Sequence, residues 1–143
     1  MNTASSVAVG AIFVWLGMVL AISFLEAPLK FRAPGITIPL GVGIGRLVFR
    51  ALNIAEAVLW LAVLAGLLLR AADASPAQLA LVVLVGVDLG LGALVLRPLM
   101  DRKVRTEGSA DHAPRTRLHL GYIALEVVKV GLLVALGVLV LAS

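Results

Sequence analysis

Four ionisable residues lie within otherwise apolar stretches of this sequence, and they are the side chains best suited to carry chemistry. An ionised group inside the hydrocarbon of a bilayer is costly, so such residues are candidates for proton, ion or substrate sites. Helical rise places them at similar depths: Asp88 and Glu126 lie about 13 Å from the basic residue that flanks their helix, Glu56 lies somewhat shallower and Lys129 somewhat deeper. We therefore expect one polar layer in a helical bundle, formed by Glu56, Asp88, Glu126 and Lys129.

This predicted layer contains three carboxylates and one ammonium group. The excess negative charge could be balanced by proton uptake, by a bound cation, or by the reach of His119 or Arg50. Those options favour proton-coupled transport or cation binding. The alternative is structural: Glu126 and Lys129 are spaced to pair on one helix face, and the other carboxylates would then join neighbouring helices.

Two helical stripes lead from the membrane surface towards this layer. The first contains Arg46, Arg50, Asn53, Glu56 and Trp60, and the second contains Arg115, His119, Tyr122, Glu126 and Lys129. Their similarity reflects either internal pseudo-symmetry or chance. A metal ion would need His119 together with carboxylates, and we predict no metal site and no resident cofactor.

The elements that must position these residues are membrane helices. The chain has 143 residues and is 62% hydrophobic and 14% charged, whereas a soluble domain is about 45–50% apolar. Its mean hydropathy is +1.11. About 20 apolar residues cross a bilayer. We predict an all-α, four-helix transmembrane bundle that forms a single domain over 1–143, with spans at about 7–25, 51–69, 79–96 and 118–142.

The charge pattern predicts the orientation of this bundle. The net charge is +4, and ten of the twelve Lys and Arg residues fall in the predicted loops 26–50 and 97–117. Basic loops remain in the cytoplasm. We therefore expect both termini outside a bacterial inner membrane, and no nucleic-acid partner. The absence of cysteine excludes disulfides and thiolate metal sites.

A glycine-rich run precedes the predicted start of the second span. Backbone N–H groups at Gly43 and Gly45, together with Arg46, would suit an anion at a helix N-terminus. With Arg50 nearby, we expect anionic lipid headgroups to be the ligand. Small residues on the first and third spans offer packing faces, and we expect a homo-oligomer.

Short motifs resemble a known membrane family. They are an Ala-Pro-x-x-Phe element at 27–31, Val-Phe at 48–49 and Arg-Leu-His at 117–119. In these the chain resembles a small four-span bacterial family of unknown function that is distantly similar to copper-resistance protein D. The resemblance implies four helices and no established reaction.

The second span also resembles the membrane-associated glutathione and eicosanoid enzymes. Arg50, Ala51, Asn53 and Glu56 match the Arg-Ala-x-x-Asn-x-x-Glu pattern of their second helix. The resemblance implies that the Asn and Glu contact glutathione and that the Arg holds its carboxylates. The third span departs from that family, because it offers Asp88 where the family carries Arg and Tyr residues.

Three functions are therefore expected. The first is ion or small-molecule binding or transport at the intramembrane layer, with Arg46, Arg50 and His119 at its cytoplasmic mouth. The second is a glutathione-dependent enzyme. The third is an accessory or assembly subunit, in which the polar layer is structural.

Overall fold

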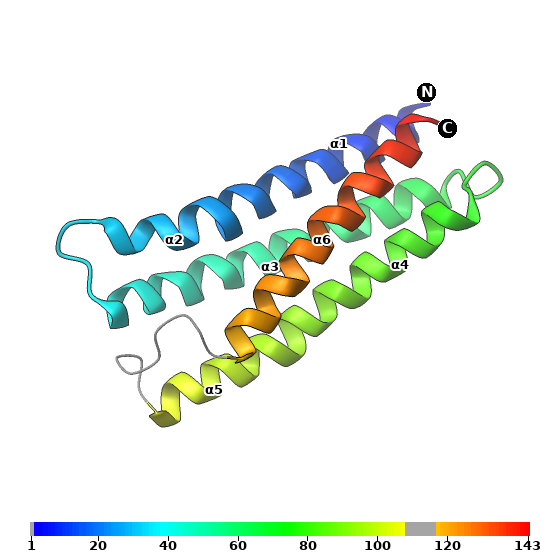
Figure 1. Ribbon diagram of the computed structural model, residues 1–143. Helices are drawn as coiled ribbons and strands as arrows, with labels where there is room; N and C mark the ends of the chain where they lie inside the picture. Colours follow the sequence, from blue (N-terminus) through cyan, green and yellow to red (C-terminus); the bar gives the residue numbers. More distant parts are fainter. Residues whose placement is uncertain (1, 108–116) are drawn as a thin grey trace.

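Four long helices make up the computed structural model, which describes residues 2–107 and 117–143 (Figure 1). The predicted all-α four-helix fold is confirmed, and the described part contains no strand. The helices that are long and apolar enough to cross a membrane are Thr3–Arg32, Ile38–Leu68, Pro76–Lys103 and Arg117–Leu141. The protein is an integral membrane protein. Arg115, in the predicted second stripe, lies outside the described residues.

Two of the four helices are composite. The first runs through α1 (Thr3–Val19), the π-helical η1 (Leu20–Glu26), α2 (Ala27–Leu29) and the 3₁₀ turn η2 (Lys30–Arg32). The second is α3 (Ile38–Leu68). The third runs through α4 (Pro76–Gly90), the π-helical η3 (Leu91–Leu96) and α5 (Arg97–Glu107). The fourth is α6 (Arg117–Leu141).

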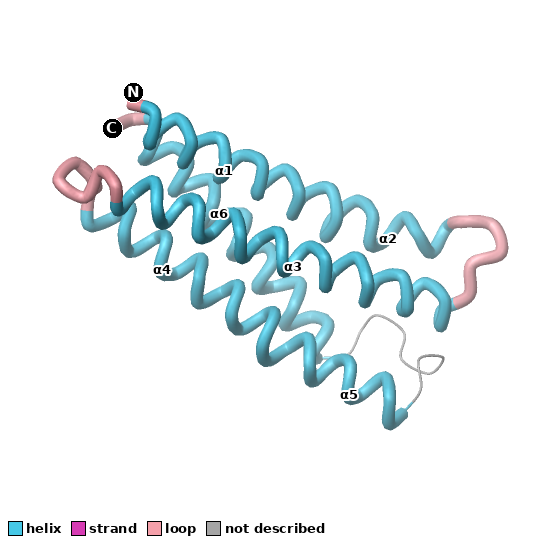
Figure 2. The backbone as a smooth tube through the Cα atoms, turned by 180° about the vertical axis from the view of Figure 1, so that it is seen from behind, coloured by secondary structure: helices cyan, strands magenta, loops and turns pink. Residues whose placement is uncertain are grey.

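The helices pack in a square in which α1 and α4 each contact both α3 and α6. The two termini and the α3–α4 connection share one end of the bundle, and the α2–α3 connection and α5 lie at the other (Figures 1 and 2). Large apolar side chains remain exposed along the outer faces, as lipid contact requires. The apolar core fills the end near the termini.

The predicted loop 26–50 is wrong at both ends, because the first helix continues to Arg32 and α3 begins at Ile38. Thr37 caps this helix by accepting a hydrogen bond from the Leu40 N–H, and Pro39 lies in its first turn, where a missing N–H costs nothing. Neighbouring side chains occupy the space beside two of the following glycines, Gly41 and Gly45. A Cβ at Gly41 would meet the Phe31 ring.

The predicted loop 97–117 is also wrong, because residues 97–107 form α5. Prolines at equivalent places shape both composite helices. The Ala27 N–H bonds back to the Ile22 carbonyl, and the Arg97 N–H bonds back to the Gly92 carbonyl. The next residue in each case is a proline, which lacks an N–H and clashes with the carbonyl one turn back. A π-helical turn accommodates this defect without ending the helix.

The two halves of the chain repeat one burial pattern with a spacing of 70 residues. Ile12, Trp15 and Val19 on α1 correspond to Val82, Val85 and Leu89 on α4, and all are buried. Glu56 on α3 corresponds to Glu126 on α6, and the two π-helical segments also correspond. The bundle is thus two similar hairpins. The α1–α6 contact and the α3–α4 contact are equivalent seams between them.

Candidate functional site

The four ionisable residues predicted to meet in one layer do meet, and Lys129 lies at their centre. Its Nζ donates to Glu126 Oε1 at 2.8 Å and to Glu56 Oε1 at 2.9 Å. Asp88 Oδ2 is 4.0 Å from the same nitrogen. All four side chains are inside the bundle: the exposed fraction is 0% for Glu56, 2% for Lys129, 3% for Glu126 and 5% for Asp88. We call these four residues the Lys129 cluster.

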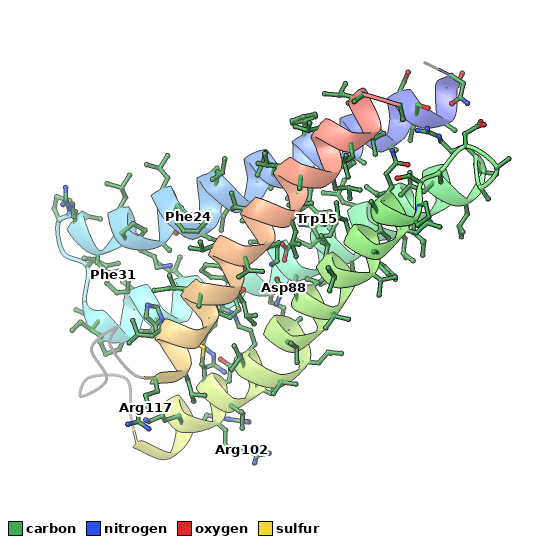
Figure 3. The ribbon with its side chains drawn as sticks, turned by 45° about the vertical axis from the view of Figure 1, so that its right-hand side comes forward. Trp15, Phe24, Phe31, Asp88, Arg102 and Arg117 are labelled. Atoms are coloured by element: carbon green, nitrogen blue, oxygen red, sulfur yellow. The ribbon has the colours of Figure 1, made fainter. Side chains whose placement is uncertain are left out.

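Two further side chains hold the carboxylates of the Lys129 cluster in place. The Trp15 indole donates through Nε1 to Glu56 Oε1 at 2.9 Å. The Ser23 hydroxyl donates to Glu126 Oε2 at 2.6 Å. Figure 3 shows Trp15 and Asp88 midway along the bundle. Every one of the four long helices therefore supplies a residue to this site.

The carboxylates of the Lys129 cluster lack some of their hydrogen-bond partners. Both oxygens of Asp88 and Oε2 of Glu56 are buried and accept no hydrogen bond from the described part of the chain. With all carboxylates ionised, three negative charges would face one positive charge. Buried charge without a partner is strongly disfavoured. The cluster can therefore take up positive charge, most simply as protons on carboxylate oxygens.

Apolar and aromatic layers close the Lys129 cluster on both sides along the bundle axis. Towards the termini lie the buried side chains of Val63, Val85 and Leu133. Towards the other end lie Phe49 and Tyr122, whose rings meet edge to face with centroids 5.7 Å apart.

Arg97 adds a cation to the aromatic layer. Its guanidinium carbon is 3.9 Å from the Phe49 centroid and 4.2 Å from the Tyr122 centroid. Cation–π contact of this kind favours a partly desolvated arginine. The layer therefore places a positive charge between the buried carboxylates and the basic end of the bundle.

The predicted stripe on the second helix divides between two surfaces. Arg46, Arg50 and Asn53 line an outer groove between α3 and the third composite helix. Glu56 instead points into the bundle, because three residues beyond Asn53 turn a helix by about 60° from the groove direction. The Arg, Asn and Glu of the glutathione-like motif thus do not line one pocket.

The premise of the predicted anion site at Gly43 and Gly45 is wrong. Both residues lie inside α3, where backbone N–H groups are bonded within the helix, and the helix begins at Ile38. Gly45 faces the end of the Lys30 side chain, whereas Gly43 and Arg46 line the outer groove. An anion there would be held by arginine side chains and not by a helix N-terminus.

His119 and Tyr122 lie on α6 towards the basic end. Tyr122 is buried against Arg97, and its hydroxyl makes no hydrogen bond within the described residues. His119 is half-buried and lies about one turn further out. Among residues 2–107 and 117–143, no group of three or more His, Asp or Glu side chains is placed to hold a metal ion.

The amino-acid sequence alone did not assign Trp15, Ser23, Phe49 or Arg97 to the site. One signal was present in the sequence: Trp15 and Ser23 are the sort of hydrogen-bond donors that an apolar helix retains when a buried acceptor needs them. No feature of the sequence identifies Arg97 as part of the site, because the charge pattern placed it in the predicted loop 97–117.

Comparison with protein-family models, curated proteins and solved structures gave no match.

Proposed function

We propose that this protein binds protons at the Lys129 cluster and couples their movement to the transport of an ion or small molecule across the membrane. The observation that carries the proposal is the placement of three buried carboxylates around a single ammonium group, with both Asp88 oxygens lacking a hydrogen-bond donor in the described chain. Intramembrane carboxylates that pair with a cation and face the bundle interior are typical of proton relays.

Charge balance supports protons as the ligand of the cluster. Two protons would bring the formal charge of the four side chains to zero. A metal cation would have to replace Lys129, whose nitrogen already occupies the point where the carboxylates converge. Protons need no such space, and a proton on Asp88 would neutralise a buried carboxylate whose oxygens accept no hydrogen bond from the described residues.

We further propose the orientation and assembly of the protein. Apart from Lys129 at the centre and Arg70 near the termini, the described Lys and Arg residues gather at the end opposite the termini, where Arg102 and Arg117 are seen in Figure 3. By the positive-inside rule, that basic end is cytoplasmic and both termini are outside, in a bacterial inner membrane. Homo-oligomerisation would use the exposed apolar helix faces.

Trp15 offers a direct readout of proton binding, because it donates to Glu56. The chain has two tryptophans, so the Trp60→Phe variant reports Trp15 alone. We expect its fluorescence to change with pH as the cluster gains protons, and the added change Glu56→Gln to abolish the response. The Trp15→Phe variant is the matched control: its Trp60 donates to the Val82 carbonyl and should not respond.

Transport itself is tested with purified protein in proteoliposomes that contain a pH-sensitive dye. We expect Asp88→Asn to lower proton flux by about tenfold or more, equivalent to about 1.4 kcal/mol or more in the barrier. Asp73→Asn, in the exposed α3–α4 connection, should leave flux unchanged. Unchanged flux in the double variant Glu56→Gln and Glu126→Gln would overturn the proposal.

An accessory or assembly role is the second candidate, favoured by the buried hydrogen bond of 2.9 Å that Lys129 on α6 donates to Glu56 on α3. In that role the cluster would specify how the helices associate and would not exchange protons. Fluorescence of Trp15 would then be independent of pH. The protein would instead co-purify with a larger membrane protein, and Lys129 variants would break that association.

A further inference from the structure

The two equivalent seams between the hairpins are closed to different extents. On the α1–α6 side, Phe13 and Ile12 pack directly against Gly137, and Ser23 bonds to Glu126 across the seam. On the α3–α4 side, two adjoining hollows of about 590 and 720 Å³ remain open, both lined by Asn53, Ala57, Ala93 and Leu94. Together they form one groove, which we call the α3–α4 groove. We propose that it holds a single anionic phospholipid.

The end of the groove away from the termini carries the charge for a phosphate headgroup. Arg46, Arg50 and Arg97 line it together with one carboxylate, Asp101. Arg46 Nε is 3.0 Å from Asp101 Oδ1, so one positive charge is compensated. Arg50 is exposed and makes no ion pair with a residue in the described chain. The Arg97 guanidinium lies against the Phe49 and Tyr122 rings. The exposed Arg50 therefore supplies the uncompensated positive charge that complements the single negative charge of a phosphodiester.

The depth of this end matches the level of lipid headgroups. The centre of α6 lies near Lys129, and the equivalent position on α3 is Leu59. Arg50 is nine residues from that level, or about 14 Å along the helix. Half of a hydrocarbon core of about 30 Å is about 15 Å. Arg50 therefore reaches the boundary between acyl chains and headgroups.

The other end of the groove is shaped for an acyl chain. Its walls are apolar, and one wall carries the small residues Gly90 and Ala93, which leave space for a chain to lie against it. Trp60 closes the floor: its ring lies against Gly86 and its Nε1 donates to the Val82 carbonyl at 2.9 Å. From Arg50 to Trp60 the groove runs about 15 Å by helical rise, the length of one leaflet.

Asn53 lies where the charged and apolar parts of the groove meet. Its side chain forms no hydrogen bond with the described residues, although it lines both hollows. A phospholipid presents ester carbonyls at this level, and the amide N–H can donate to one of them. A soluble anion would leave the apolar half of the groove empty. A purely apolar molecule would leave the arginines without a negatively charged partner.

Native mass spectrometry of the purified full chain with defined lipids tests this proposal. We expect phosphatidylglycerol to be retained in preference to phosphatidylcholine, with one molecule per chain. Arg50→Ala should lower the retained fraction by about fivefold, the effect of one arginine near an anionic surface. The matched control is Arg32→Ala, a charge at the same end of the bundle but outside the groove.

The acyl-chain part is tested by filling the groove. Gly90→Leu adds a side chain where a Cβ meets nothing within 4 Å, so the helix itself need not move. We expect it to lower phosphatidylglycerol retention as strongly as Arg50→Ala. Gly131→Leu, on α6 with equally open surroundings, is the control and should retain the lipid. Ala93→Leu serves as a second groove-filling variant if Gly90→Leu does not fold.

Three outcomes would overturn the proposal. The first is equal retention of the two lipids, and the second is equal loss in Arg32→Ala or Gly131→Leu. The third is an oligomer that dissociates in Gly90→Leu without any change in lipid retention, since the groove would then be a contact between copies of the chain. None of these readouts depends on proton binding at the Lys129 cluster.

Discussion

At the scale of single residues, Lys129 is the side chain that balances the charge of the buried carboxylates. Its ammonium group is desolvated, and the cost is offset only because two carboxylates accept hydrogen bonds at 2.8 and 2.9 Å and a third lies 4.0 Å away. The repeat places Leu59 at the equivalent position of the other hairpin. The ammonium group therefore belongs to one hairpin alone, although both hairpins supply a glutamate.

Replacing Lys129 by leucine should strongly destabilise the protein. The substitution leaves buried carboxylates without a cation, and removal of one partner of a buried pair costs about 3–5 kcal/mol. Equilibrium unfolding in mixed micelles measures the change. Adding Glu56→Gln and Glu126→Gln to Lys129→Leu should restore most of the lost stability. Failure of this rescue would show that Lys129 stabilises the bundle by packing and not by charge.

At the scale of elements, glycine and proline positions decide how the helices approach one another. Two prolines induce π-helical turns where the sequence was expected to leave the membrane. The helices continue past these turns and carry Arg97 to the rings of Phe49 and Tyr122. Glycines in turn admit large side chains from neighbouring helices, as Gly86 does for the Trp60 ring.

Gly86→Ala should therefore destabilise the α3–α4 contact. A Cβ at this position would lie 2.8 Å from the Trp60 indole, which is held by its hydrogen bond to Val82. Overpacking of this kind costs about 1–3 kcal/mol.

Gly131→Ala is the comparison variant, because its added Cβ meets nothing within 4 Å. It should leave stability unchanged or raise it by up to about 1 kcal/mol through helix propensity. Equal stability of the two variants, measured by thermal unfolding in the same detergent, would contradict the assignment of Gly86 to close packing.

At the scale of the whole molecule, two similar hairpins have acquired different roles. Both supply a buried glutamate to the centre, but the seam between α1 and α6 is closed and the seam between α3 and α4 is grooved. Asp88 lies midway along the bundle, and Arg102 and Arg117 lie at the end opposite the termini (Figure 3). The two ends of the bundle therefore differ in charge, and the two contacts between the hairpins differ in how closely they pack.

The proposed orientation is testable because the chain contains no cysteine. Single cysteines are introduced at Ala72, in the α3–α4 connection, and at Ala33, in the α2–α3 connection. A membrane-impermeant maleimide should label Ala72→Cys in intact cells and label Ala33→Cys only after lysis. The reverse labelling would place the termini in the cytoplasm.

The fold class, the number of helices and the shared layer of the four buried charges could all be predicted from the amino-acid sequence. These follow from apolar length and helical rise, which are local properties. The shared layer of Glu56, Asp88, Glu126 and Lys129 could be predicted because each depth could be counted from a basic flank.

Only the tertiary structure decided which partners these charges have. Rotation around a helix cannot be read from depth, so Glu56 was grouped with Arg50 and Asn53 although it points away from their groove and into the bundle. The contacts of Trp15 and Ser23 join residues 41 and 103 positions apart. Helix boundaries also depended on tertiary packing: α3 includes residues 38–50, where Phe31 and Lys30 at the end of the first helix pack against Gly41 and Gly45.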